Sequence, residues 1–199
     1  MTTTQSPDTA GAASVSPADE RRSAERRRLR KYLIVFFVPV VVVALWVCWS
    51  FFADRLPVDA PKLTGATART CAAVHSALPG KLLGEDSRPV SAGSGSADAA
   101  AAWGDPAMVL RCGVGTPAVL DPKSSSYDPT VQAEDINGVC WVDQKGKAGG
   151  TVFTTVKQRV FVELTVPASA AGGNSPLPEL TSAISRNDPV DPAKQFDCA

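Results

Sequence analysis

The sequence predicts an α+β domain, a small antiparallel four-stranded sheet with flanking helices in the order α-β-β-β-β-α, preceded by one transmembrane helix. Three observations lead to this prediction. Residues 32–53 form one uncharged apolar run. Between residues 107 and 166, hydrophobic side chains alternate along short segments separated by turn residues, as they do in strands. On either side of these segments, apolar residues recur with the period of a helix.

The apolar run at residues 32–53 has the length of a membrane-spanning helix. Its 22 residues would extend roughly 33 Å, against about 30 Å for the hydrocarbon core of a bilayer. Tyr32 at one end and Trp46 and Trp49 near the other are typical of the membrane interface. The apolar part of a signal peptide is shorter, about 7–15 residues, and no A-x-A-like cleavage site closes this run. We therefore expect an uncleaved anchor.

The distribution of charge predicts the topology. Residues 1–31 carry seven basic and four acidic side chains, whereas residues 54–199 carry 13 basic and 16 acidic ones. The positive-inside rule then places residues 1–31 in the cytoplasm, as a disordered basic tail, and residues 54–199 outside a cell membrane that the chain crosses once. The outer part has no basic stripe, so we expect the lipid bilayer but no nucleic acid among the partners.

The outer part is predicted to begin with a stalk and a helix. Pro57 and Pro61 favour an extended chain over residues 54–66. In residues 67–78, three apolar side chains fall on one helical face, and the Pro-Gly pair that follows ends the helix. Residues 91–99 are rich in glycine and serine and predict a flexible loop.

Four strands are predicted next. The clearest lies at residues 159–166, where aliphatic side chains on one face alternate with Phe161, Glu163 and Thr165 on the other. The others lie at residues 107–115, 139–142 and 151–156. A short helix at residues 177–184 closes the domain, and the last dozen residues are predicted to form a flexible tail.

The domain predicted at residues 67–199 contains four of the five cysteines, which suggests two disulfides formed in an oxidising compartment. The four are Cys71, Cys112, Cys140 and Cys198. Four cysteines allow three pairings, and spacing alone does not choose between them. We favour Cys71–Cys112, which would tie an early helix to a central strand, and Cys140–Cys198, which would pin the C-terminal tail to the sheet.

The sequence predicts no catalytic residue, no cofactor and no metal site. Nucleophilic catalysis needs a base beside a hydroxyl or thiol, and His75 is the one histidine of the chain. Cys71 and His75 share a helical face, but zinc sites normally show closely spaced ligand pairs, and no C-x-x-C is present. The acid pairs Glu85-Asp86 and Glu134-Asp135 lie in predicted loops, where such pairs are usually solvated.

Trp103, Asp105, Arg111 and Trp141 form a candidate binding corner. A tryptophan before a Gly-Asp-Pro turn, with an arginine on the following strand, could line a shallow pocket. Two aromatic rings and a fixed cation suit a sugar or a peptide carboxylate. The alternative is that both tryptophans fill the core and that Arg111 pairs with Asp105 or Glu163 at its rim.

Several short motifs occur together over about residues 67–185. They are Cys71 with Leu78-Pro79, Trp103-Gly104-Asp105-Pro106, Val109-Leu110-Arg111-Cys112-Gly113-Val114, Asn137-Gly138-Val139 with Trp141, Phe153-Thr154-Thr155, and Arg159 followed by Val162-Glu163-Leu164-Thr165-Val166-Pro167. In this combination the chain resembles the DUF3515 family of actinobacterial single-pass membrane proteins of unknown function. The resemblance implies an anchored extracytoplasmic domain in a high-GC Gram-positive bacterium and implies no activity. The chain departs from the family pattern at Cys140, so that Cys140 and Cys198 would be an added pair, which supports the pairing favoured above.

The expected function is that of a membrane-anchored extracytoplasmic accessory or binding domain of the actinobacterial cell envelope, and not that of an enzyme. Its partner would be another envelope protein or a cell-wall component, met through one sheet face or the corner near Trp103. The rival from another class is an envelope enzyme acting on cell-wall precursors or thiols, which would need a reactive side chain such as a free thiol. A third alternative is signalling through the tail of residues 1–31.

Overall fold

The computed structural model describes residues 35–49, 55–170, 175–194 and 196–198. The chain divides into two compact units, Met1–Ala53 and Asp54–Ala199. In the first unit, residues 35–49 form a helix whose large apolar side chains are exposed. The predicted tail and both ends of the predicted membrane span lie outside the described residues. Among the helices of the described residues, none combines the length and the hydropathy that a bilayer crossing requires.

The second unit is built on one antiparallel sheet with the strand order β2-β3-β5-β6-β10-β9-β8-β7. In that order the strands are Lys81–Leu82, Glu85–Arg88, Ala100–Trp103, Met108–Val114, Phe161–Val166, Thr151–Thr155, Val139–Lys145 and Glu134–Ile136. Two further strands, β1 (Leu56–Pro57) and β4 (Val90–Ser91), form a small parallel pair. The helices are α2 (Gly65–Ser76) and α3 (Leu177–Asn187), with short 3₁₀ turns at Ala97–Ala99, Ala118–Leu120 and Lys147–Gly149.

The α+β class is confirmed, but the predicted four-stranded sheet is wrong, because the main sheet has eight strands. The four predicted strands are β6, β10, β9 and β8, which lie side by side in its centre. The missed strands have two to four residues each. β3 is Glu-Asp-Ser-Arg and β5 is Ala-Ala-Ala-Trp, compositions with low strand propensity. Backbone pairing with a neighbour, rather than hydrophobic alternation, therefore defines these strands.

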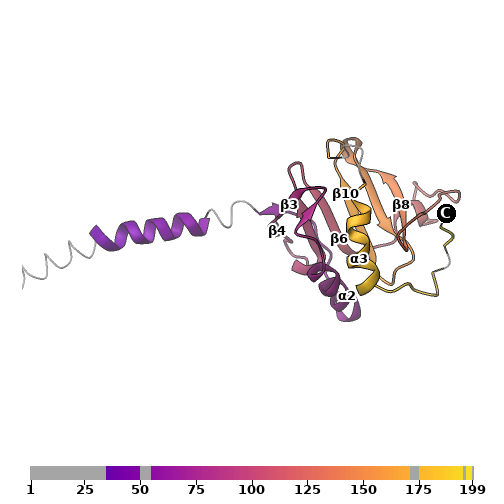
Figure 1. The fold of residues 1–199 in the computed structure, drawn as a ribbon, viewed down its shortest axis with the longest axis horizontal. Helices are drawn as coiled ribbons and strands as arrows, with labels where there is room; N and C mark the ends of the chain where they lie inside the picture. Colours follow the sequence, from indigo (N-terminus) through magenta and orange to yellow (C-terminus); the bar gives the residue numbers. More distant parts are fainter. Residues whose placement is uncertain (1–34, 50–54, 171–174, 195, 199) are drawn as a thin grey trace, which may run out of the picture. The chain divides into compact units, whose positions relative to one another are not determined.

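Helices α2 and α3 contact each other and pack on one side of the sheet, which we call the helix face (Figure 1). Side chains from both helices and from alternate positions of the central strands form the main core there. On β10 the buried members are Val162, Leu164 and Val166, which agrees with the predicted alternation. The order helix, strands, helix therefore produces a helical layer over one sheet face.

The opposite side of the sheet, which we call the loop face, carries irregular segments instead of helices. Over β5 and β6 lies the segment predicted to be a free stalk. Its Val58 and Ala60 are buried, and its strand β1 pairs with β4. The predicted loop at residues 91–99 is ordered against the same segment, since a Cβ on Gly95 would collide with the backbone of Ala60. The former stalk is thus part of the domain, because its apolar residues find a surface that the sequence does not reveal.

The C-terminal segment is also attached to the sheet, although we predicted a flexible tail. Gln158 and Val190 form a β-bridge, and so do Ala133 and Cys198. Cys198 is bonded to Cys140 on β8, with their Cα atoms 6.1 Å apart. Cys71 on α2 is bonded to Cys112 on β6, with their Cα atoms 5.7 Å apart. The structure therefore contains the two pairs that we favoured.

Asp188 lies at the start of this C-terminal segment and is fully buried. Its carboxylate oxygens accept the Val160 N–H at 3.3 and 3.2 Å. Burial raises the pKa of Asp188 to about 6 from its ordinary 3.8, against the opposing effects of the Val160 N–H and the charge of Lys194. The folded state therefore holds this proton more tightly than the unfolded chain does.

We expect the free energy of unfolding to fall as the pH rises from about 4 to about 6, by up to ~3 kcal/mol from Asp188 alone. The reason is that the buried carboxyl must then ionise. In Asp188→Asn this decrease should be absent from urea unfolding curves recorded between pH 4 and pH 7. Asp86→Asn, in an exposed ion pair with Lys81, is the matched control. Parallel pH profiles for the wild type and Asp188→Asn would contradict the assignment.

Candidate ligand-binding groove

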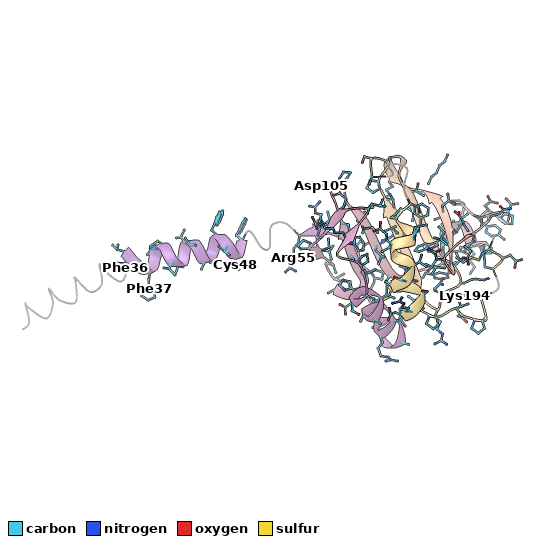
Figure 2. All side chains as sticks on the ribbon, in the orientation of Figure 1. Phe36, Phe37, Cys48, Arg55, Asp105 and Lys194 are labelled. Carbon is cyan, nitrogen blue, oxygen red and sulfur yellow. A yellow bond between two sulfur atoms is a disulfide. The ribbon has the colours of Figure 1, made fainter. Side chains whose placement is uncertain are left out.

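The predicted binding corner is not assembled in the structure. Trp103 is buried in the core of the helix face, and its Nε1 donates to the Pro79 carbonyl at 2.9 Å. Trp141 is buried in the same core, and its Nε1 has no hydrogen-bond partner among the described residues. Asp105 is exposed in the turn after β5, 3.6 Å from Arg88 (Figure 2). The two tryptophans therefore serve packing.

Arg111 lies on the other side of the sheet from the two tryptophans. Its neighbours on β6, Leu110 and Cys112, point into the core of the helix face. Because successive side chains of a strand point to opposite faces, Arg111 belongs to the loop face. Its partner across the strands is Glu163 on β10, one of the two partners that the packing alternative named.

A groove of about 420 Å³ lies over Arg111 and Glu163. Its floor contains polar side chains from four neighbouring strands, Arg111 (β6), Glu163 (β10), Thr154 (β9) and Gln144 (β8). Its walls are formed by residues 59–61 of the former stalk and by residues 113–118 after β6. The groove therefore lies over the centre of the sheet, between residues 59–61 on one side and residues 113–118 on the other.

The Arg111 side chain is held in place by three hydrogen bonds. Its Nε and Nη2 donate to the same oxygen of Glu163, at 3.0 and 2.6 Å, and its Nη1 donates to the Asp59 carbonyl at 3.3 Å. The side chain of Arg111 is 32% exposed and that of Glu163 is 16% exposed. The charge-assisted hydrogen bonds and the partial burial of both side chains fix the geometry of the pair. The groove therefore presents a rigid polar floor.

The wall at residues 113–118 depends on a bulge at Gly113. Phe161 of β10 is paired with Val114, but Val162 is paired with Cys112, so Gly113 is an extra residue in β6. Its φ of +83° favours glycine, and a Cβ there would collide with the Leu63 side chain. The bulge redirects the chain at the end of β6, so that residues 115–118 rise beside the floor.

Two other hollows lie elsewhere on the domain. One, of about 530 Å³, is lined by His75, Arg88 and Asp98 and by residues 100–103 of β5. The other, of about 300 Å³, is lined by Tyr127, Phe161, Lys194 and mainly apolar neighbours, and Lys194 Nζ covers the Phe161 ring at 3.6 Å from its centroid. Within the described residues, no group of three His, Cys, Asp or Glu side chains is placed to hold a metal ion.

Sequence reasoning found part of the groove. It singled out Arg111 and placed Glu163 on the face opposite the aliphatic side chains of β10. It did not find Thr154, Gln144 or the wall at residues 59–61. Thr154 is 2% exposed and Gln144 is partly buried. Thr154 stands in the Phe153-Thr154-Thr155 motif of the family resemblance, which assigns it no role, and Gln144 stands in no motif. The register of β9 against β10 could have placed Thr154 beside Glu163, but no local pattern reports that register.

The chain was found to resemble one known family. Residues 33–193 match the model of the DUF3515 family, which is described as a protein of unknown function. No curated protein and no solved structure matched the chain. The family match covers more than half of the 199 residues and includes every strand and both helices of the domain. The chain therefore belongs to the DUF3515 family.

Proposed function

We propose that this protein is a single-pass membrane protein of the actinobacterial cell envelope whose extracytoplasmic domain binds an envelope component in the groove of the loop face. It acts as an accessory or binding domain and not as an enzyme. The anchor and its orientation rest on the apolar run at residues 32–53 and on the basic residues before it.

The Arg111–Glu163 pair is the observation that carries the proposal. Ion pairs contribute little net stability whether they are exposed or buried, because side-chain entropy and desolvation offset their attraction. This pair lies on the floor of a hollow, beside Thr154 and Gln144, on the sheet face that the helices leave uncovered. Fixed polar groups that converge in a concave site are typical of ligand recognition.

Photo-crosslinking in intact cells tests the proposal. A photoreactive residue at Thr116, which is exposed in the groove wall, should form a specific adduct. The same residue at Ser76, exposed on α2, is the matched control. Arg111→Lys keeps the charge but loses the planar fork, so we expect it to reduce the Thr116 adduct at least tenfold. Equal adducts from both positions, or an adduct that Arg111→Lys leaves unchanged, would sink the proposal.

The alternative function is an envelope enzyme that acts on cell-wall precursors or thiols. One observation favours it, since His75 lines the hollow that also contains Arg88 and Asp98. The thiol version requires a disulfide to open, because the four cysteines of the domain are paired. If His75→Ala reproduces the cellular phenotype of deleting the protein and Arg111→Lys does not, that result would favour the enzyme.

A further inference from the structure

We propose that the ligand of the groove is a neutral, hydroxyl-rich chain, that is, an uncharged oligosaccharide. This inference rests on the proposed function, because it names the ligand class of the same groove. The sequence left two ligand classes open for Arg111, a sugar and a peptide carboxylate. Charge, hydrogen-bonding capacity and strand order in the structure favour the first.

The charge of the groove opposes an anionic ligand. Arg111 is the one cationic side chain among the described residues that line the groove, and its Nη2 is already 2.6 Å from Glu163 Oε1. Asp59 is a second acidic residue in the lining. The lining therefore has a net charge of −1. A carboxylate ligand would have to displace Glu163 from Arg111 or remain close to two like charges, and both cost free energy.

The hydrogen-bonding capacity of the pair suits hydroxyl groups. A guanidinium has five N–H donors, and three of those of Arg111 are used by Glu163 and the Asp59 carbonyl. The other two N–H groups, one on Nη1 and one on Nη2, have no acceptor within the part of the chain that the structure describes. Glu163 Oε1 accepts both bonds from Arg111, and Oε2 accepts none from the described residues. The pair thus has both unused donors and an unused charged acceptor, and hydroxyl groups, which both donate and accept, can satisfy both kinds.

The floor continues this pattern across the sheet. Arg111 is paired with Glu163, and Glu163 with Thr154, so the three side chains form a row on three adjacent strands. Gln144 on the next strand adds an amide that donates and accepts. With strands about 4.8 Å apart, the four strands span roughly 14 Å. A floor of this length suits several linked sugar rings better than a single small ion.

The strand order opposes an extended peptide. Peptides that bind to sheets usually add a strand to a free edge, where unpaired backbone groups supply the hydrogen bonds. The floor strands β6, β10, β9 and β8 are all internal, and each has a paired strand on both sides. The groove therefore offers side chains rather than backbone groups.

Binding of defined probes to the full-length protein in detergent micelles tests this inference. The probes are neutral hexasaccharides of N-acetylglucosamine, glucose, mannose and galactose, and an N-acetylated tripeptide with a free C-terminal carboxylate. Isothermal titration calorimetry should detect at least one hexasaccharide and no binding of the tripeptide. The charge-removing variant Glu163→Gln separates the two ligand classes, because it should change their affinities in opposite directions.

For a hexasaccharide, Glu163→Gln should weaken binding at least tenfold, because the charged acceptor is lost. For a carboxylate ligand the same change would strengthen binding, because the competing charge is gone. Gln144→Ala, which does not touch the ion pair, should weaken hexasaccharide binding several-fold and guards against a folding defect of Glu163→Gln. Asp86→Asn, which removes an exposed carboxylate outside the groove, should leave the affinity unchanged.

Each contrary result overturns a defined statement. Tripeptide binding that Glu163→Gln strengthens would overturn the oligosaccharide while leaving the groove as the binding site. Failure of all four hexasaccharides at millimolar concentration, together with a Thr116 adduct in cells that depends on Arg111, would also overturn the oligosaccharide alone. Hexasaccharide binding that Glu163→Gln and Gln144→Ala leave intact would overturn the groove itself and with it the proposed function.

Discussion

Replacement of both Cys71 and Cys112 by alanine is expected to lower the free energy of unfolding of the domain by about 4 kcal/mol. The disulfide joins residues 41 positions apart and so removes much of the conformational freedom of the unfolded chain. Both cysteines lie in the main core, where they join α2 to a central strand. A domain of this size has a total stability of only about 5–15 kcal/mol, so the loss is a large fraction of it.

Urea unfolding of residues 54–199, followed by circular dichroism, measures this effect. Cys140→Ala with Cys198→Ala is the comparison, since that disulfide spans 58 positions and attaches the C-terminal segment. Chain entropy alone predicts a similar loss for the two double variants. Replacement of Cys140 and Cys198 should in addition expose the hollow at Tyr127, because Phe196 forms part of its wall. A loss below about 1 kcal/mol for the first double variant would show that the bond between α2 and β6 is not a main source of stability.

Trp103→Ala is expected to destabilise the domain by about 3–5 kcal/mol. The ring is 1% exposed, and its removal leaves a large cavity between the sheet and the helices. The Pro79 carbonyl also loses its donor. The sequence placed Trp103 in a candidate binding corner, where Trp103→Ala would be expected to affect ligand binding alone. The structure instead predicts that this variant loses function by unfolding, so that it cannot report on a binding site.

Thermal unfolding of two further variants separates packing from function. Trp103→Phe keeps most of the buried ring but loses the hydrogen bond to Pro79, and we expect a cost of about 1–3 kcal/mol. Asp105→Ala changes an exposed side chain two residues away and should alter stability by no more than about 0.5 kcal/mol. A stable, fully folded Trp103→Ala that has lost only ligand binding would restore the corner as a site.

The groove depends on pairings between distant parts of the chain. Arg111 and Glu163 are 52 positions apart, and Glu163 meets Thr154 only through the register of β9 against β10. A register shifted by one residue would turn each of these side chains to the other face. The sequence suggested that Arg111 pairs with Asp105 or Glu163, because both acids lay within plausible reach, and it could not choose. The choice follows from the strand order, which places β10 beside β6.

The stalk shows the same limit in another form. Residues 54–66 contain prolines and few large apolar side chains, and locally they predict an extended, solvated chain. Val58 and Ala60 are nevertheless buried, since β1 pairs with β4 and the segment lies over Ala100 and Val109. Two small apolar residues such as Val58 and Ala60 do not form a pattern from which burial can be predicted. The surface that buries it is assembled from residues about 30 to 50 positions further along the chain.

By itself, the sequence left three pairings open for the four cysteines of the domain, and the structure decided between them. The sequence did determine the α+β class, the four central strands and both helices of the domain. These features are encoded locally, because a strand or helix buried against a core must place apolar side chains at the period of its own backbone. Tertiary structure alone decided the number of strands, the packed stalk, the attached C-terminal segment and the groove. The short outer strands are defined by backbone hydrogen bonds to a neighbour, and the groove is defined by the register of four strands. The short strands and the groove do not depend on a side-chain pattern within one segment, so the sequence of a single segment cannot predict them.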